Sequence, residues 1–436
     1  MKIVFVVPGF EGTFYCQNCI RDIDLIEGFR NNNYDAILAP VYMPSRLNNS
    51  LEAETPVFFG AVNVYLREKL PFYNLVPKFL RKILDSRKLL NWISKKSDST
   101  DPKGLEEMTL SVMKGDEGKH HQDLKKMIDW LKNDIKPDIV HVSNLLLTGI
   151  AVQIKKELGI KVFVSLQDEN TWIDLMDMNY QKKIWDVVYQ SSSYVDSFIS
   201  VSQYYKDFVM EKTSLPSDKI NVSWVGVPSK NFVSNKPSFD PPIIGFISRI
   251  SKSLGFDILL DAFIELKKLV EYKDLRLRVT GGMSSYDKPF IKEQFKKIKK
   301  HNLSSFIEWE ADLFKTDMPA FFKGLTVVSV PAPNGEAFGL FQLQALASGI
   351  PLVLPAKGAF SEVIAATKGG VTFESVTVAE LSKTLNSLLS NPEKVYSLST
   401  SGLKSIEEKF SIDQSVKRLL NIYSKYDGEN KEGKAE

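Results

Sequence analysis

Short runs of apolar residues alternate with longer amphipathic stretches along the first 225 residues. The apolar runs are nearly continuous, as expected of parallel strands whose two faces are both covered by helices. The stretches between them repeat with a helical period, for example at Leu124, Met127, Ile128 and Leu131. This alternation predicts a doubly wound α/β domain. Its expected strands are 3–7, 35–38, 138–142, 161–166, 197–201 and 220–225.

A polar stretch that contains Pro237, Pro241 and Pro242 interrupts this pattern. Prolines and polar residues in such a cluster are typical of a connecting segment. The strand–helix rhythm then restarts and predicts a second doubly wound domain of the same class. The strands expected in this second domain are 243–248, 275–280, 306–309, 327–330, 351–354 and 370–373.

The last part of the pattern is an amphipathic helix at 411–426. Ser411 and Gln414 have the spacing of a capping box at its start, and we expect this helix to pack back on the N-terminal domain. Two doubly wound sheets are expected to face one cleft with the carboxyl ends of their strands, where ligands bind. The predicted organisation is an N-terminal Rossmann-like domain at 1–228, a linker at 229–241, a C-terminal Rossmann-like domain at 242–410 and a disordered tail at 427–436.

The composition is that of an ordinary globular protein. The chain has 436 residues, of which 43% are hydrophobic and 25% charged, so each domain can bury a sizeable core. A net charge of +3 is too small to indicate a nucleic-acid partner. No stretch approaches the roughly 18 apolar residues that span a bilayer, and the apolar run at 3–7 is too short for a secretory signal. We therefore expect a cytoplasmic protein, either free or at the inner face of the cytoplasmic membrane.

The two cysteines, Cys16 and Cys19, form a C-x-x-C pair. A redox couple and half of a zinc site are two functional interpretations of this spacing. Zinc usually takes four ligands, and the four histidines lack ligand spacing relative to the pair. We favour a structural interpretation, in which two small apolar side chains stand at the start of a helix.

A basic, amphipathic segment covers 65–100, where nine Lys and Arg residues stand against three acidic ones. One interpretation is a pair of helices that makes a weak peripheral contact with a membrane surface. The alternative, which we favour, is that the apolar stripe packs on the first domain while the charges face water.

The most informative segment is 333–364, which reads as a strand end, a loop, a helix that opens near Gly339 and ends at Gly349, and another strand. Glu336 stands just before the helix N-terminus. Backbone amides at such a terminus favour an anion, for example a phosphate. A carboxylate beside that anion can accept hydrogen bonds from sugar hydroxyls.

This segment resembles the E-x7-E donor motif of the family 4 retaining glycosyltransferases, which have the GT-B fold. The motif is carried by Glu336-Ala-Phe-Gly-Leu340 and by Gln344. Ile244-Gly-Phe-Ile-Ser-Arg249 and the nine residues from Gly255 also look like segments of this family. Further similar segments, some of them typical of a bacterial subgroup, begin at Pro8, Thr13, Val62, Pro137, Leu166 and Ser200.

The resemblance implies a nucleotide-diphosphate-sugar donor held mainly by the second domain and a glycan or lipid-linked acceptor held mainly by the first. Transfer would retain the anomeric configuration, with no cofactor and no required metal, and would serve the synthesis of cell-surface polysaccharide. The D-x-D sequence at Asp22 and Asp24 is then interpreted as the solvated start of the first helix rather than a metal clamp.

The resemblance also assigns roles to single residues. Glu336 would contact the donor sugar, and the planar guanidinium of Arg249 would bind the diphosphate. Asp168 and His141 complete the candidate catalytic set, although His141 is also explained as a satisfied histidine at a strand end. Gln167 and Asp168 are expected on the acceptor side. The candidate donor-binding residues are Gly12, Thr13, Arg249, Lys252, Leu254, Gly281, Glu336, Phe338, Gly339, Leu340 and Gln344.

Three positions depart from the family pattern. Leu254 stands where the family has a lysine, with Lys252 two residues earlier; Gln344 replaces the second glutamate; and Gln167 replaces a histidine. Losing the lysine removes a full charge from the diphosphate site. An active glycosyltransferase is therefore weighed against a catalytically weakened GT-B subunit that binds a ligand or partner chain. A GT-B epimerase is a third hypothesis, but the sequence lacks its convergent set of acid–base residues.

Overall fold

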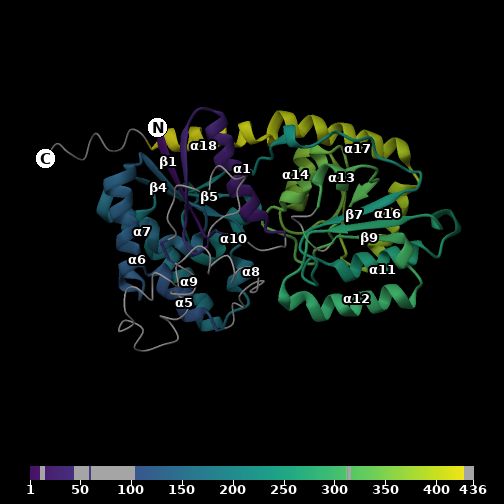
Figure 1. Ribbon diagram of the computed structural model, residues 1–436, viewed down its shortest axis with the longest axis horizontal. Coiled ribbons are helices and arrows are strands. Elements are labelled where there is room, and N and C mark those ends of the chain that lie inside the picture. Colours follow the sequence, from purple (N-terminus) through teal and green to yellow (C-terminus); the bar gives the residue numbers. More distant parts are fainter. Residues whose placement is uncertain (10–14, 44–57, 60–103, 311, 313–315, 427–436) are drawn as a thin grey trace. The chain divides into compact units, whose positions relative to one another are not determined.

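The computed structural model describes residues 1–9, 15–43, 58–59, 104–310, 312 and 316–426. The chain forms two compact units (Figure 1). Unit 1 comprises Met1–Gly12, Asn18–Trp224 and Ser415–Glu436, and unit 2 comprises Thr13–Gln17 and Val225–Gln414. Each unit is described below by itself.

Unit 1 contains a parallel six-stranded sheet in the order β2-β1-β3-β4-β5-β6. The strands form because their residues are apolar, often β-branched, and buried on both faces; β1 has the sequence KIVFVV and five of its six residues are buried. All six predicted strands are confirmed, with ends that shift by a few residues. They are β1 (Lys2–Val7), β2 (Asp35–Pro40), β3 (Ile139–Val142), β4 (Lys161–Leu166), β5 (Ser197–Ser200) and β6 (Ile220–Val222).

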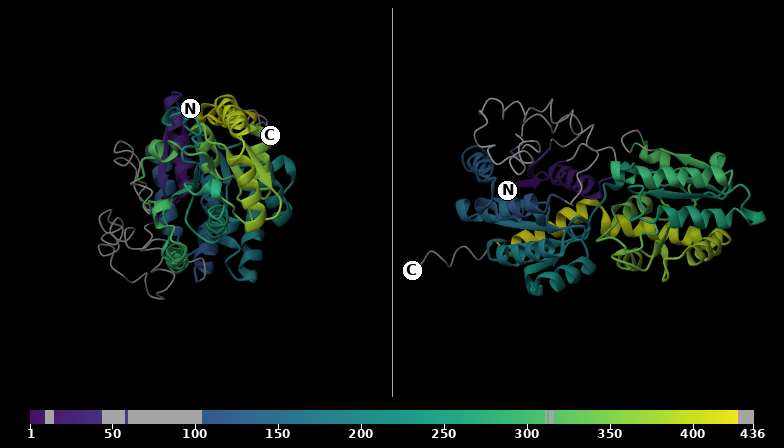
Figure 2. Two further views of the ribbon diagram at one scale, coloured as in Figure 1. Left: turned by 90° about the vertical axis from the view of Figure 1, so that its right-hand side faces the viewer. Right: turned by 90° about the horizontal axis from the view of Figure 1, so that it is seen from below.

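Helices cover both faces of this sheet, as Figures 1 and 2 show. The helix predicted from Leu124, Met127, Ile128 and Leu131 is present, and these four side chains are buried. The described helices that belong wholly or mainly to unit 1 are α1 (Gln17–Asn31), α5 (Glu106–Met113), α6 (His121–Trp130), α7 (Thr148–Leu158), α8 (Asn170–Ile173), α9 (Met178–Ser191), α10 (Gln203–Thr213) and α18 (Ile412–Lys425).

Unit 2 repeats the architecture with a parallel sheet in the order β12-β11-β10-β7-β8-β9. All six predicted strands are again confirmed. The strands of unit 2 are β7 (Ile243–Ile247), β8 (Arg276–Thr280), β9 (Ile307–Trp309), β10 (Val327–Val328), β11 (Leu352–Pro355) and β12 (Gly370–Phe373).

The helices of unit 2 lie on both sides of its sheet, with α11 and α12 on one side and α14 on the other (Figure 1). The helix α14 is buried at all eight of its positions, so it is the central helix of this unit. The helices are α11 (Phe256–Leu266), α12 (Lys288–Lys300), α13 (Met318–Phe322), α14 (Leu340–Ala347), α15 (Phe360–Thr367), α16 (Val378–Leu389) and α17 (Pro392–Ser405).

The observed division differs from the predicted one at two places. Unit 2 begins at Val225 and includes the stretch predicted as a linker, because that stretch bonds to unit 2: Asn235 N donates to Ser348 O at 2.9 Å and Ser238 N to Leu325 O at 3.2 Å. The short segment Thr13–Gln17 also belongs to unit 2. The predicted cleft between the domains stays a prediction, and the tail 427–436 lies outside the described residues.

The C-terminal helix α18 changes units along its length. The first turn of α18 belongs to unit 2, where Ile412 N donates to Val227 O at 2.8 Å. The rest of the helix, from Ser415 onward, belongs to unit 1. Ser411 caps this helix through a long contact of 3.4 Å from Gln414 N to its hydroxyl oxygen, which is one half of the predicted capping box. No helix within the described part of the chain combines the length and the hydropathy of a membrane span.

Candidate active site

The strongest candidate site lies at the switch point of the unit 2 sheet. The strands β7 and β10 are neighbours in this sheet, and chain order runs in opposite directions from them. Ligands of doubly wound sheets bind at such a point, beyond the carboxyl ends of the strands. Arg249 follows β7 and Glu336 follows β10, so the topology brings the two predicted residues to the same edge.

Glu336 is a buried carboxylate that the protein satisfies at one oxygen only. Its side chain is 8% exposed. The oxygen Oε1 accepts a hydrogen bond from Gln17 Nε2 at 3.0 Å, whereas the buried Oε2 has no hydrogen-bond partner among the described residues. Burial raises the pKa of Glu336 to about 7, and the Gln17 hydrogen bond and the Arg249 charge oppose that shift. An unsatisfied buried oxygen of this kind is costly unless a ligand supplies a donor.

Two glycines let the Glu336 loop lie directly against the turn after β11. Gly335 and Gly358 have φ values of +68° and +58°. A Cβ added at Gly335 would stand 2.4 Å from Lys357 C, and one at Gly358 would stand 2.5 Å from Glu336 O. A backbone hydrogen bond from Ala359 N to Glu336 O, 3.0 Å long, joins the Glu336 loop to this turn. The position of Glu336 is therefore fixed by rigid backbone contacts on both sides.

Arg249 supplies the positive charge at this edge. Its side chain is 37% exposed, and its Nε lies 3.7 Å from Asp287 Oδ2. Its Nη2 donates to Ser253 Oγ at 3.4 Å, and its Nε is buried with no hydrogen-bond partner among the described residues. Arg249 acts on Glu336 electrostatically, since its charge lowers the pKa of that carboxyl. The guanidinium therefore acts on Glu336 through its charge, and its Nε is a donor that the described residues leave unused.

The N-terminus of helix α14 bonds to the same Gln17 side chain as Glu336. It begins after Gly339, whose φ is +85°, and its first amide, Leu340 N, donates to Gln17 Oε1 at 3.0 Å. Gln344, one turn further along, is buried and its Oε1 accepts from the Tyr15 hydroxyl at 2.7 Å. Phe338 is 4% exposed and packs as part of the core. The predicted motif residues therefore converge within unit 2.

The remaining predicted donor residues stand around this edge. Gly281 follows β8, has a φ of +123°, and its carbonyl accepts from Tyr15 N at 2.6 Å. Lys252 is exposed, and Leu254 is half-buried in the turn before α11. The predicted residues Gly12 and Thr13 lie outside the described residues.

On unit 1, His141 is held by the fold itself. It is 2% exposed at the end of β3. Its Nδ1 lies 2.5 Å from the Tyr423 hydroxyl and its Nε2 lies 2.7 Å from Ser165 Oγ. Burial, assisted by the Arg21 charge, lowers the pKa of His141 to about 3, so the ring is neutral. This is the satisfied strand-end histidine of the sequence analysis, rather than a free acid–base group.

Gln167 and Asp168 lie in the loop after β4, which is organised by Glu169. Glu169 is 4% exposed and accepts from Leu145 N at 3.0 Å and from the Tyr205 hydroxyl at 2.9 Å. It also accepts from the amides of Gln167 and Asp168, at 2.8 and 3.1 Å. Burial raises the pKa of Glu169, and the hydrogen bonds from Leu145, Gln167 and Tyr205 oppose the shift. Asp168 is half-buried, whereas Gln167 is buried with its Oε1 unpartnered among the described residues.

The D-x-D sequence is not the solvated helix start that we expected. Asp22 is 6% exposed and its Oδ1 lies 2.5 Å from Arg21 Nη2. Burial raises the pKa of Asp24 to about 7, and the Glu27 charge adds to that shift. The prediction was wrong because this part of α1 turns inward, so that both acids lie within unit 1.

The cysteine pair also differs from the favoured interpretation. Cys16 and Cys19 are disulfide-bonded, and they are the two cysteines of the sequence. The prediction of two apolar side chains was wrong because three residues of chain at a helix start bring the sulfur atoms within bonding reach. The basic segment 65–100 lies outside the described residues, so its two interpretations stay open.

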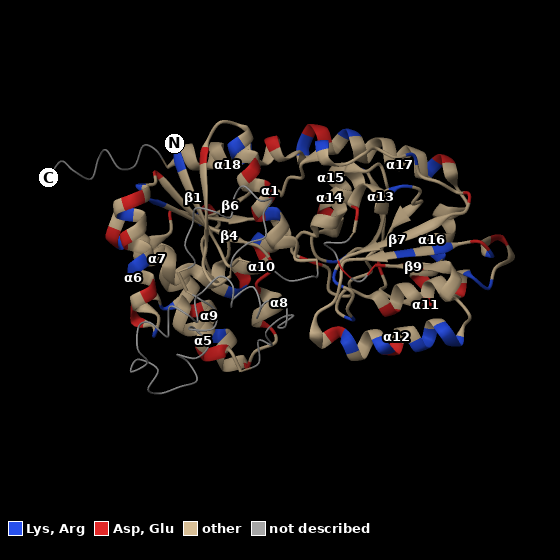
Figure 3. Cartoon of the chain, viewed as in Figure 1, with Lys and Arg blue, Asp and Glu red and all other residues tan. Residues whose placement is uncertain are grey.

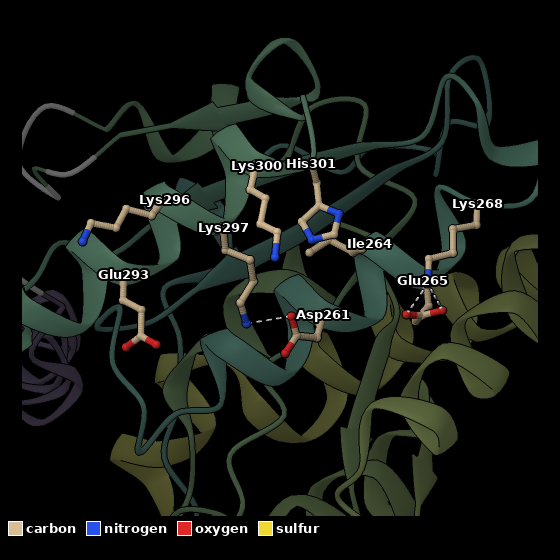
Figure 4. Close-up of a pocket in the computed structure, with 9 residues that line it drawn as sticks. All are labelled: Asp261, Ile264, Glu265, Lys268, Glu293, Lys296, Lys297, Lys300 and His301. Carbon is tan, nitrogen blue, oxygen red and sulfur yellow. Dashed lines mark hydrogen bonds and ion pairs between the residues drawn. The ribbon is translucent and has the colours of Figure 1, made fainter.

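A hollow on unit 2 has a lining that does not include Glu336 or Arg249. It is a groove of about 410 Å³ between α11 and α12, and none of the predicted site residues lines it (Figure 4). Lysines follow α12 along its exposed side (Figure 3). Within the groove Lys297 pairs with Asp261 at 2.7 Å and Lys268 with Glu265 at 2.7 Å. The groove is an open surface of paired charges rather than a closed polar site.

Sequence reasoning missed three residues of these sites: Tyr15, Gln17 and Glu169. Tyr15 lies 329 residues before its partner Gln344, and Gln17 lies 319 residues before its partner Glu336. No periodicity or motif in the sequence links positions so far apart. Glu169 directly follows the predicted acceptor-side pair, so its position after a strand end was a usable signal.

Comparisons with known proteins show which sequences and folds this chain resembles. Residues 229–404 match the family described as Glycosyl transferases group 1. The D-inositol 3-phosphate glycosyltransferase of Corynebacterium aurimucosum is 24% identical over 183 residues, which are 42% of each chain. The lipopolysaccharide core biosynthesis mannosyltransferase LpsB of Rhizobium meliloti is 24% identical over 182 residues, or 41% of this chain and 50% of LpsB. The chain thus spans about half the length of the curated relatives it matches.

The fold is that of the GT-B class, with two Rossmann-like units. The crystal structure of Anabaena HepE in complex with UDP aligns with a TM-score of 0.69 at 14% identity, covering 98% of this chain and 100% of HepE. The region that matches the glycosyl transferases group 1 family falls within unit 2, which carries Glu336 and Arg249.

Proposed function

We propose that this protein is a glycosyltransferase that moves a sugar from a nucleotide-diphosphate-sugar to a glycan or lipid-linked acceptor. The observation that carries the proposal is the state of Glu336: a buried carboxylate with one unpartnered oxygen, under the charge of Arg249 and in front of the α14 N-terminus. A nucleotide sugar complements each of these features, since its diphosphate is an anion and its sugar offers hydroxyl donors.

In this proposal, unit 2 stabilises the leaving group. Transfer breaks the bond between the anomeric carbon and a diphosphate oxygen, and negative charge grows on that oxygen. The Arg249 guanidinium and the amides at the start of α14 are preorganised donors for this charge. Glu336 then holds the sugar ring through its hydroxyls. We further propose that the reaction retains the anomeric configuration and needs no metal, because these groups supply the positive charge themselves.

The names of related proteins narrow the choice of substrates. HepE has been crystallised with UDP and with UDP-glucose, so a uridine diphosphate sugar is the first donor to test. LpsB is named as a mannosyltransferase of lipopolysaccharide core synthesis, which favours an acceptor that belongs to a cell-surface polysaccharide. Synthesis at the inner face of the cytoplasmic membrane would suit such an acceptor.

A catalytically weakened subunit that only binds its ligand is the second candidate. Leu254 and Gln344 favour it, because a charge is missing where the family has a lysine and a glutamate. Gln344 Oε1 accepts from the Tyr15 hydroxyl at 2.7 Å, and Leu254 follows Ser253, whose hydroxyl accepts from Arg249 at 3.4 Å, which supports including both positions in the proposed site.

A donor panel tests the proposal on the full chain. UDP-glucose, GDP-mannose and ADP-glucose are added in thermal-shift assays, and the release of the nucleoside diphosphate is then followed by chromatography. A donor at 100 times its Kd stabilises the folded state by about 2.7 kcal/mol, so we expect a clear rise in Tm with at least one. We also expect turnover to survive EDTA. No shift with any donor would contradict the proposal, and binding without turnover would favour the weakened subunit.

A further inference from the structure

The helix α12 concentrates positive charge on the surface of unit 2 (Figure 3). Its 13 residues, KPFIKEQFKKIKK, include six lysines and one glutamate, so its formal net charge is +5. The whole chain has a formal net charge of +3, which leaves −2 for the remainder. The charge is therefore a local property of α12 and not part of a generally basic chain.

The helical period separates a buried, a paired and an exposed side of α12. Ile291 and Ile298 are buried against unit 2. Glu293 and Lys297 line the groove toward α11, where Lys297 pairs with Asp261 at 2.7 Å (Figure 4). The exposed side, called the basic face below, has the i, i+4, i+7, i+8, i+11 spacing of one side of a helix. It consists of Lys288, Lys292, Phe295, Lys296 and Lys299.

The charges of the basic face are not neutralised by the protein. Lys292, Lys296 and Lys299 have no ion pair with any residue that the structure describes. Like charges three or four residues apart repel one another and destabilise a helix. An anionic surface laid against this face would remove that repulsion.

An aromatic ring stands among these lysines. Phe295 is 39% exposed, and its ring packs on Trp309 with a centroid distance of 4.7 Å. Trp309 supports the ring on one side while the rest of it stays accessible. An apolar ring in this position can enter the headgroup region of a bilayer while the surrounding ammonium groups stay with lipid phosphates.

We propose that the basic face of α12 is a docking surface for an anionic lipid bilayer. The lysine ammonium groups lie against the lipid phosphates, and the Phe295 ring enters the headgroup region. The composition of α12 favours a bilayer over a nucleic acid, because its cations are all lysines. Arginine recognises phosphates and bases through its planar fork, whereas lysine is a point charge that responds to the potential of a charged surface.

The expected strength follows from the number of lysines. Each lysine near an anionic membrane surface strengthens partitioning about fivefold, so three contribute about 100-fold. Salt weakens this attraction, because the Debye length falls from about 10 Å at 0.1 M to about 3 Å at 1 M ionic strength. The contribution of the Phe295 ring should resist salt.

Two variants with equal loss of charge separate the basic face from net charge. The basic-face variant replaces three exposed lysines by glutamine, at Lys292, Lys296 and Lys299. The control variant replaces three exposed lysines elsewhere in unit 2 by glutamine, at Lys273, Lys383 and Lys394.

The test is sedimentation of the full chain with vesicles. One set is phosphatidylcholine alone, and the other contains equal parts of phosphatidylcholine and phosphatidylglycerol, each at low and at high salt. We expect the wild-type protein and the control variant to bind the anionic vesicles, and the partition coefficient to fall about 100-fold in the basic-face variant. Phe295→Ala should lower the binding that remains at high salt. The basic-face variant changes exposed side chains only, so it keeps the test valid if Phe295→Ala does not fold.

Three results would overturn the inference: no binding of the wild-type protein to anionic vesicles, equal loss in the two lysine variants, or binding to an RNA or DNA duplex in place of vesicles. The inference does not depend on the proposed function, since vesicle binding needs no donor. The basic-face variant should bind nucleotide sugars as the wild type does, because Glu336 and Arg249 are unchanged. A donor panel without any binder would contradict the proposed function and leave the vesicle result standing.

Discussion

Two pairs of polar side chains, Glu169 and His141 in unit 1 and Glu336 and Arg249 in unit 2, differ in how completely the fold satisfies them. In unit 1, Glu169 accepts four hydrogen bonds and His141 is bonded at both ring nitrogens. In unit 2, Glu336 has one oxygen and Arg249 one nitrogen with no hydrogen-bond partner among the described residues. A saturated network rigidifies a fold, whereas an unsatisfied group is ready for a ligand. The comparison predicts a structural role for the first pair and a binding role for the second.

The largest effect that this comparison predicts is on transfer, in Glu336→Gln. Losing a preorganised polar group at the reacting centre typically lowers turnover by about 10²–10³-fold. Stability should not fall, since the variant removes a buried carboxylate that the fold leaves half satisfied. Initial rates and urea unfolding measure the two effects. Glu393→Gln, an exposed position on α17, is the control. Full activity in Glu336→Gln would remove Glu336 from its assigned role.

The opposite result is expected for Glu169→Leu in unit 1. Four donors lose their acceptor at once, and leaving such groups buried costs about 3 kcal/mol or more. Urea unfolding should show this loss as a lower midpoint. The affinity of folded Glu169→Leu for the nucleotide sugar should stay near that of the wild-type protein, since unit 2 is untouched. A variant as stable as the wild type would mean that the network in unit 1 is not structural.

The architecture was readable from the sequence because it depends on periodicity. Apolar runs such as those at β1 and β7 are buried on both faces, so their strand character is visible residue by residue. Glu336 and Arg249 were found because a motif fixes them to strand ends, and the topology then brings β7 and β10 together.

The misses share a different physical cause. Which residues a loop brings to a distant helix depends on tertiary structure, so the contacts of Tyr15 and Gln17 with α14 left no local trace. Burial of a charged residue is equally invisible locally, and Asp22 looked like a solvated acid although Arg21 pairs with it inside unit 1. Sequence patterns predict elements, whereas partners of buried polar groups require coordinates.

A smaller predicted effect is a change of folding stability with pH that is caused by Glu336. Burial raises the pKa of Glu336 from 4.5 to about 7, so the folded protein binds a proton that the unfolded chain has lost. The stability contributed by this group is therefore present below pH 4.5 and is lost as the pH rises through 7. The other charges on the elements around it are Arg249, Asp287 and Lys357.

The stability of Glu336→Gln relative to the wild type should consequently increase between pH 4.5 and 7.5, by roughly 2 kcal/mol. Urea unfolding at a series of pH values measures the difference, and Glu393→Gln should show none. Transfer by the wild-type protein should rise over the same range, because the ionised carboxylate is the better hydrogen-bond acceptor. A difference that is flat with pH would show that Glu336 titrates normally.

The smallest effect is a gain of binding in Leu254→Lys. Leu254 stands in the turn before α11, next to Ser253, whose hydroxyl accepts from Arg249 at 3.4 Å. A lysine here adds a second cation beside the proposed diphosphate. Because the position is half-buried and screened by water, the gain should stay near 1 kcal/mol, or less than tenfold in Kd. Titration with the nucleoside diphosphate at low and at high salt measures it.

Two features make this gain specific to the site. Leu269→Lys adds the same charge at another exposed position of unit 2, after α11, and should leave the Kd unchanged. The gain in Leu254→Lys should also shrink at high salt, because added ions screen a partly exposed charge pair. An equal gain from both lysines would indicate attraction by net charge alone. No gain from Leu254→Lys would mean that the diphosphate does not bind at the Arg249 turn. The case for ligand binding by unit 2 would then depend on Glu336 alone.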